Sequence, residues 1–152
     1  MSFESGVYPV YDTEFKIGTK GKASTSADMV AIADMETFSM KIDGKTETWT
    51  SMTEKGWERA LMTGKSFSIG LKGKRNVGDT GNDYVAATAW KDGLDCSTKA
   101  QIVFPDASKL DFNCVIDVSN PGGDDSNKVA PLEFDLKGDG RPVYTAATPV
   151  TP

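Results

Sequence analysis

Paired carboxylates are the first residues in this chain that could do chemistry. Asp111 and Asp117 could supply the acid and the base that hydrolyse a glycosidic bond. They stand six positions apart in one predicted strand, which separates them by about 20 Å, too far for joint action on one bond. The chain has no histidine, so the commonest general base and zinc ligand is also missing. The sequence therefore predicts no catalytic residue and favours a protein that is not an enzyme.

A second group of side chains could bind a metal ion. Carboxylate and amide oxygens suit Ca²⁺, and one short stretch is rich in both. The residues concerned are Asp117, Asn120, Asp124, Asp125 and Asn127. Their spacing does not match an EF-hand loop, so a hydrated turn is the favoured interpretation. We predict no metal site and no cofactor.

The three tryptophans, Trp49, Trp57 and Trp90, could stack on a sugar. Large aromatic side chains more often pack in a core or at an interface. A monomeric carbohydrate-binding β-sandwich module, with Trp49 or Trp57 as its platform, nevertheless stays open as an alternative function.

The two cysteines, Cys96 and Cys114, invite a disulfide. If the chain turns at 105–108, Cys114 lies opposite Lys99 in the hairpin, and Cys96 lies three positions further along. A direct bond is then not expected. We predict buried free thiols, which are typical of a reducing compartment.

Alternating apolar and polar residues in four stretches indicate the strands that must position these side chains. Their apolar rows are Phe67, Ile69 and Leu71; Ala100, Ile102 and Phe104; Leu110, Phe112, Cys114, Ile116 and Val118; and Leu132, Phe134 and Leu136. Each row gives a sheet one dry face, so the sequence predicts a mainly β protein with a shared interior.

Turn signals predict how the strands connect. Asp43-Gly44 predicts a two-residue hairpin that places Phe38 opposite Trp49. Residues 53–56 predict a further turn. Residues 57–62 could form a helical turn or a strand, and a strand is the favoured interpretation. Pro105 to Ser108 predict the second long hairpin, with a strain of about 1 kcal/mol if Ala107 has a positive φ. After Gly138 to Gly140, residues 142–144 are expected to run back beside the last strand.

One helix is predicted, from Asp79 or Thr80 to Trp90. Asp79 or Thr80 can cap the first free N–H groups, Asp83 suits the positive first turn, and Gly93 lies just past the end. Its alanines allow close packing on the flank of a sheet.

Length and charge limit the organisation of the chain. It has 152 residues, of which 38% are apolar, enough for one domain with its own core. We expect an N-terminal arm at 1–11, a β domain at 12–145 with a long polar loop at 18–28, and a disordered C-terminal tail at 146–152. The net charge of -5 argues against a general nucleic-acid binder. We find no membrane span or export signal and expect a soluble protein.

Between residues 30 and 145, a series of short motifs resembles one known family. The motifs are Glu36-Thr37-Phe38, Asp43-Gly44-Lys45 leading to Trp49, Gly56-Trp57-Glu58, Thr63-Gly64-Lys65-Ser66, Gly73-Lys74-Arg75, Gly78-Asp79, Asn82-Asp83-Tyr84, Phe104-Pro105-Asp106 and Gly138-Asp139-Gly140-Arg141-Pro142. Their order and spacing resemble the major tail tube proteins of long-tailed phages of Gram-positive bacteria. Where such proteins often carry glycine, this chain has Ala107, which affects only the geometry of that turn.

The resemblance implies an α+β, mainly β fold: an antiparallel β-sandwich or barrel-like tail tube domain with one flanking α-helix. It implies hexameric rings that stack into a tube, through which DNA passes without being held. Implied partners are a tape measure protein and tail initiator and terminator proteins. The implied location is the virion, after assembly in the host cytoplasm. Candidate residues for subunit contacts are Phe3, Tyr8, Tyr11, Lys20, Lys22, Met29, Trp49, Trp57 and Tyr144.

Overall fold

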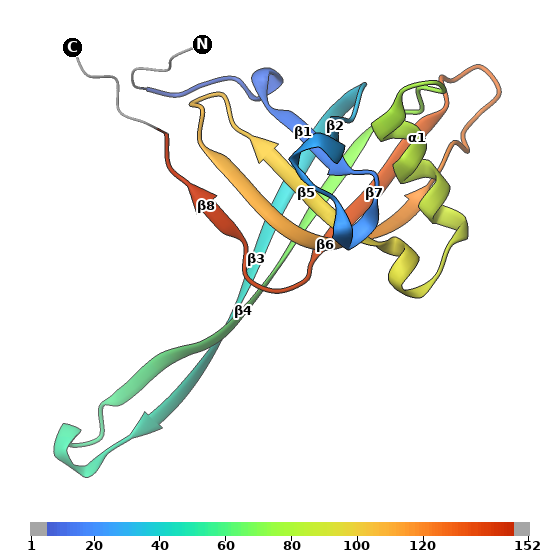
Figure 1. Cartoon of the computed structure of the whole chain (residues 1–152). Coiled ribbons are helices and arrows are strands. Elements are labelled where there is room, and N and C mark those ends of the chain that lie inside the picture. The colour runs from blue at the N-terminus through green and yellow to red at the C-terminus, as the bar shows by residue number, and fades with distance from the viewer. Residues whose placement is uncertain (1–5, 148–152) are drawn as a thin grey trace.

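A computed structural model describes residues 6–147 of the chain, with the elements labelled in Figure 1. Its strands are β1 (Glu14–Gly18), β2 (Met29–Ala31), β3 (Met35–Thr50), β4 (Glu58–Lys74), β5 (Ser97–Val103), β6 (Lys109–Asn120), β7 (Pro131–Gly138) and β8 (Val143–Thr145). The only α-helix among the described residues is α1 (Thr80–Ala87), which is followed by the 3-10 turns Thr88–Trp90 and Gly93–Cys96. None of the helices in this part of the chain is long and apolar enough to cross a lipid bilayer.

The strands form one antiparallel sheet that curls until its two ends meet. The order is β2-β1-β5-β6-β7-β4-β3, with β8 paired to β6. Only Ile32, Ala33 and Asp34 connect β2 to β3, and a connection this short spans at most about 14 Å. Phe15 of β1 touches Phe38 of β3 edge to face, with ring centroids 4.9 Å apart. The sheet is therefore a barrel-like shell, and the predicted fold class is confirmed.

The interior of the shell holds the apolar rows that the sequence predicted. Fully or almost fully buried side chains are Ile17, Ile69, Leu71, Val85, Ala100, Ile102, Cys114, Ile116, Leu132, Phe134 and Leu136. They come from five strands and from α1, so burial of one shared interior, and not any single hairpin, stabilises the curled sheet.

α1 covers one flank of the shell, as Figure 1 shows. Asp79 caps the helix as predicted, because its carboxylate accepts a hydrogen bond from the backbone N–H of Asn82 at 3.0 Å. Val85 is completely buried against the core. The predicted last turn, up to Trp90, is a 3-10 turn.

The first predicted hairpin is wrong. β3 continues through Asp43 and Gly44, which pair with Ser66 and Lys65 of β4. Phe38 accordingly lies opposite Leu71, and not opposite Trp49. An Asp-Gly pair permits a tight turn but does not require one, and the longer ladder pairs far more backbone groups.

The chain reverses instead at residues 51–57, where the second turn was predicted. Lys55 and Gly56 both have positive φ there, at 52° and 90°. For Gly56 this backbone conformation carries no strain, because glycine has no Cβ. β4 follows directly, so the turn at 53–56 and the strand after it are confirmed.

The second hairpin forms as predicted, but its register differs by one residue. Cys114 pairs with Thr98 and not with Lys99. The turn sets this register. The backbone N–H of Phe104 donates to the carbonyl of Ser108 at 2.9 Å, so the loop consists of residues 105–107, an odd number, and the pairing shifts by one residue. Ala107 in this loop has φ 73°, so the condition under which strain was expected at this turn is met.

Both cysteines are buried and free, as predicted. Burial raises the pKa of the Cys114 thiol to about 12. This thiol is therefore neutral at physiological pH.

β8 does not run back beside β7, contrary to the prediction. It pairs with the first residues of β6, Lys109 to Asp111, whereas β7 pairs with the second half of β6. β7 and β8 both pair with the edge of β6 that faces away from β5, so β8 lies end to end with β7. Asp139 keeps the chain on this path because its backbone N–H donates to the carbonyl of Asn113 at 2.9 Å.

The polar loop at 18–28 is folded on its own subunit. Ser24 is buried, and its hydroxyl donates to the carbonyl of Gly21 at 2.7 Å. Thr98 of β5 donates to the carbonyl of Gly18 at 2.6 Å. The predicted limits of the arm, domain and tail stay a prediction, and residues 1–5 and 148–152 lie outside the described part.

Candidate assembly interface

β3 and β4 continue beyond the shell as a long two-stranded projection, visible in Figure 1. β4 pairs with β7 only from Ser68 to Lys74. The ring of Phe67 still packs on Phe112 of β6, with centroids 5.3 Å apart, but before Phe67 the strand pairs with β3 alone. We call residues 40–66 the ribbon and its turn, residues 51–57, the tip. At a rise of about 3.4 Å per residue the ribbon is about 35 Å long. An isolated two-stranded hairpin is only marginally stable in water, so we expect a neighbouring surface to cover it.

One face of the ribbon continues the dry face of the sheet. Met40, Ile42 and Met62 lie on it and are 42%, 66% and 47% exposed. The side chain of Met62 occupies the space where a Cβ on Gly44 would lie, 2.8 Å from its methyl carbon. Gly44 therefore makes room for Met62 within the strand, which explains a glycine there without a turn.

The opposite face of the ribbon is polar near the shell and more apolar near the tip. Lys41 lies 4.0 Å from the carboxylate of Asp43. Further out, the guanidinium of Arg59 lies 5.4 Å from the ring centroid of Trp49, a cation-π contact. Leu61, beside this pair, is 60% exposed.

The tip carries the most exposed large apolar side chains of the ribbon. Met52 is 97% exposed and Trp57 is 78% exposed. Apolar side chains that gather on a projecting element are typical of a surface that binds another protein.

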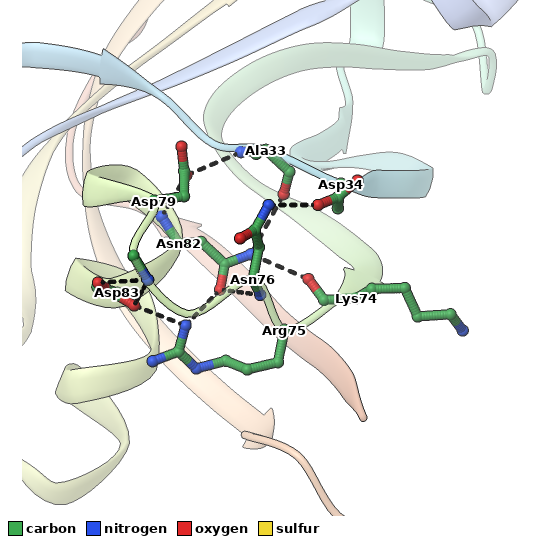
Figure 2. Close-up of polar contacts among 9 residues, drawn as sticks. Ala33, Asp34, Lys74, Arg75, Asn76, Asp79, Asn82 and Asp83 are labelled. Atoms are coloured by element: carbon green, nitrogen blue, oxygen red, sulfur yellow. Dashed lines mark hydrogen bonds and ion pairs between the residues drawn. The ribbon is translucent and has the colours of Figure 1, made fainter. Parts of the chain in front are cut away.

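A network of polar contacts fixes the other end of the β3–β4 pair, as Figure 2 shows. Asn82 is completely buried at its centre. Its side-chain oxygen accepts hydrogen bonds from Arg75 at 2.9 Å and from the backbone N–H of Asn76 at 3.1 Å. Its side-chain nitrogen donates to the carbonyls of Lys74 at 2.9 Å and Ala33 at 3.2 Å. One side chain thus joins α1, the end of β4 and the link between β2 and β3.

Two carboxylates complete this network. Asp79 also accepts from the backbone N–H of Ala33 at 3.1 Å. Asp83 forms an ion pair with Arg75 at 2.8 Å. Arg75, Asp79, Asn82 and Asp83 all belong to motifs that carried the family resemblance, and the structure brings these separate motifs together.

The predicted interface residues lie in three regions. Trp49 and Trp57 lie in the ribbon; Tyr8, Tyr11 and Tyr144 are exposed on the N-terminal segment and on β8; and Lys20, Lys22 and Met29 lie in or beside the 18–28 loop. Phe3 lies outside the described residues. A role of these residues between subunits stays a prediction.

The two lysines of the 18–28 loop already have partners in their own subunit. Lys20 lies 3.8 Å from Asp28, and Lys22 lies 3.2 Å from Asp139. A hydrogen bond from the backbone N–H of Thr25 lowers the pKa of Asp28, with Lys20 as a smaller cause. Both lysines therefore help to hold this loop in place.

The prediction did not include the exposed methionines and aliphatic residues of the ribbon. These residues are Met40, Ile42, Met52, Leu61 and Met62. Their signal was present in the sequence, because Phe38, Met40 and Ile42 alternate with polar residues. Alternation alone cannot reveal that this row leaves the shell and loses its cover.

The carboxylates and amides weighed for catalysis or metal binding have other partners. Asp111 accepts a hydrogen bond from Gln101 at 2.8 Å, and Asp117 pairs with Lys137 at 3.7 Å. The side-chain oxygen of Asn120 accepts from the backbone N–H of Gly123 at 2.7 Å. Within residues 6–147, no group of three or more Cys, Asp or Glu side chains is placed to hold a metal ion.

The tryptophans do not form one platform. Trp49 and Trp57 belong to the ribbon, whereas Trp90 lies in a 3-10 turn on the shell. The ring of Trp49 is also in contact with Arg59. The side chains weighed for sugar stacking are therefore divided between two parts of the molecule.

The described residues form a curled antiparallel sheet with one flanking helix and a projecting ribbon. No protein-family model and no curated protein matches the sequence. Similarity of fold is found with solved structures.

Two solved structures show this similarity of fold. A chain of the tail of an empty gene transfer agent particle, refined with helical C6 symmetry, superposes with a TM-score of 0.70 at 19% identity, covering 92% of this chain and 100% of that one. A chain from the virion of a native gene transfer agent particle superposes with a TM-score of 0.68 at 21% identity, with the same coverage of both chains. At this identity the likeness establishes the fold.

Proposed function

We propose that this chain is the structural subunit of a tail tube in a long-tailed phage or a particle derived from one. Copies associate as hexameric rings, the rings stack, and DNA passes through the resulting conduit. The chain performs no catalysis in this role. The motif series supports a phage of a Gram-positive bacterium as the source.

The ribbon is the observation that carries this proposal. It holds an apolar row outside the shell, where a monomer would leave it in water, and a second copy offers the cover that it lacks. β3 is also the last strand of the sheet, and an unpaired edge of this length invites pairing unless an assembly closes it. A tail chain of the same fold comes from a particle with C6 symmetry, which supports rings of six.

Under this proposal the partners are further copies of the chain, a tape measure protein, and tail initiator and terminator proteins. The assembled protein resides in the virion, and assembly takes place in the host cytoplasm. DNA is a passenger, since a chain with a net charge of -5 gains little from phosphates.

Electron microscopy of the concentrated purified chain, or of the chain produced together with its tail genes, tests the proposal. We expect tubes built from rings with sixfold symmetry. A chain that stays monomeric under both conditions and is retained on a polysaccharide column would refute it and support a carbohydrate-binding module instead.

A further inference from the structure

We infer that the tip of the ribbon docks on the opposite end of the β3–β4 pair in a second copy of this chain. We call that end the far pole and define it by Val77 and Val129. The inference rests on the proposed function, because it identifies the surfaces through which one ring holds the next.

The strand register places the tip and the far pole at opposite ends of the molecule. β4 leaves the tip and has 17 residues, which is about 50 Å of extended chain. At its far end the backbone N–H of Arg75 donates to the carbonyl of Ala130 at 2.8 Å. Val77 and Val129 each lie within two residues of this bond, so both belong to the end that is remote from the tip.

Val77 is exposed, but its backbone is held on both sides. Its side chain is 82% exposed. The side chain of Asn76 donates to the carboxylate of Asp34 at 2.6 Å, and the backbone N–H of Gly78 donates to Asp83 at 3.1 Å. A large apolar side chain on a fixed backbone loses little further freedom on binding, which favours a docking role over that of a solvated loop.

Val129 has similar support. Its side chain is 66% exposed. The next residue, Ala130, accepts the bond from Arg75, and the preceding residue, Lys128, donates to the carbonyl of Asp125 at 3.0 Å. The far pole therefore presents two valines from different segments on a backbone that is already ordered.

The tip matches this surface in chemistry, because both expose apolar side chains. It is narrow and projecting, and it ends in Met52 and Trp57, the exposed apolar residues described above. A protrusion and an apolar surface at opposite ends of one chain cannot meet within one copy. Between copies they form a head-to-tail contact that repeats without limit, which is the contact that stacked rings need.

A second exposed apolar surface provides the control. Trp90 and Leu94, in the 3-10 turns after α1, are 82% and 79% exposed. They follow the C-terminal end of α1, whereas Val77 precedes its N-terminal end, so the eight residues of the helix separate the two surfaces. If exposure alone decided docking, the tip would bind here equally well.

Disulfide trapping tests the inference. Glu54→Cys protein, changed at the tip beside the apolar anchors, is mixed with Lys128→Cys protein, changed next to Val129; the mixture is assembled into tubes and oxidised with copper phenanthroline. Since a disulfide needs Cα atoms within about 7 Å, we expect covalent dimers in roughly tenfold higher yield than from Glu54→Cys with Trp90→Cys. The two native cysteines are buried and also present in both mixtures. Tubes that yield no such dimers, or an equal yield with Trp90→Cys, would overturn the inference.

A further variant, Trp57→Ser, removes the contact without a cross-link. We expect Trp57→Ser to lower the amount of sedimentable tubes by roughly tenfold or more, as when a buried aromatic anchor is lost, and to leave single rings. Trp57→Ser tubes as abundant as those of the unmodified chain would overturn the docking contact but not the tail tube. Failure of the unmodified chain to form any rings or tubes would overturn both.

Discussion

At the scale of single residues, Asn82 is the side chain on which the network at the base of β3 and β4 depends most. It uses all four of its hydrogen-bonding positions described above, and it is 0% exposed. Leucine has the same branched arrangement of heavy atoms but no polar atom, so Asn82→Leu leaves two carbonyls, one N–H and the Arg75 guanidinium without this partner. Buried polar groups without partners are costly.

We therefore expect Asn82→Leu to lower the free energy of unfolding by about 3 kcal/mol, measured by urea denaturation. Asn127→Leu, in an exposed loop, is the matched control and should change stability little. Equal effects of the two substitutions would contradict the assigned role of the network.

Asp135 is a residue whose charge opposes stability. It lies directly opposite Asp117 on neighbouring strands, and like charges in that position repel. Asp117 has Lys137 nearby at 3.7 Å. We expect Asp135→Asn to raise the free energy of unfolding by about 0.3 kcal/mol at low salt.

The gain should disappear at about 1 M salt, where charges are screened within a few ångströms. Urea melts at both salt concentrations measure the difference, with Asp124→Asn in an exposed loop as a variant of equal charge change. A loss of stability at low salt would show that Asp135 has a favourable partner that outweighs the repulsion.

At the scale of elements, the ribbon should differ between the free subunit and the assembly. Its backbone hydrogen bonds join only two strands, and its side chains are exposed, so local opening costs little. We expect the amides of residues 58–66 to exchange rapidly in the free chain and at least roughly tenfold more slowly in tubes. Hydrogen exchange with mass spectrometry measures this.

The amides of β6 and β7 around Ile116 and Leu136 serve as the reference. Both side chains are buried, so these amides should be protected in the free chain and in tubes alike. A ribbon already protected in the free chain would mean that it needs no neighbour.

Most elements could be predicted from the sequence, because their signals are local. The apolar rows define the core strands, and Asp79 sets the start of α1. Pairing was harder where a local signal competed with a longer ladder, as at Gly44. It was also harder where a loop fixed the register, as at Ala107. Neither outcome depends on the residue in the turn alone.

The candidate interface was harder still to predict. Trp49 and Trp57 were identified because large aromatics are conspicuous, and the structure places both on the ribbon. Met40, Ile42 and Met62 have the same pattern as core residues, because the ribbon continues the core face of the sheet. The point where β7 stops pairing with β4, at Ser68, leaves Ile42 and Met62 without cover, and the local sequence does not mark that point.

At the scale of the whole molecule, charge and apolar contact act against each other in assembly. Each copy carries a net charge of -5, so copies repel one another at long range. The surfaces proposed to join them are apolar, and salt does not weaken contacts of that kind. Screening should therefore favour assembly.

We expect the protein concentration needed for tubes to fall when NaCl rises from about 10 mM to about 150 mM, where the Debye length shrinks from about 30 Å to about 8 Å. Light scattering over a protein dilution series at each salt concentration measures this. Urea melts of the unassembled chain at the same salt concentrations separate assembly from a change in subunit stability. If added salt dissolved the tubes, ion pairs between copies, and not the apolar tip and far pole, would provide most of the binding energy.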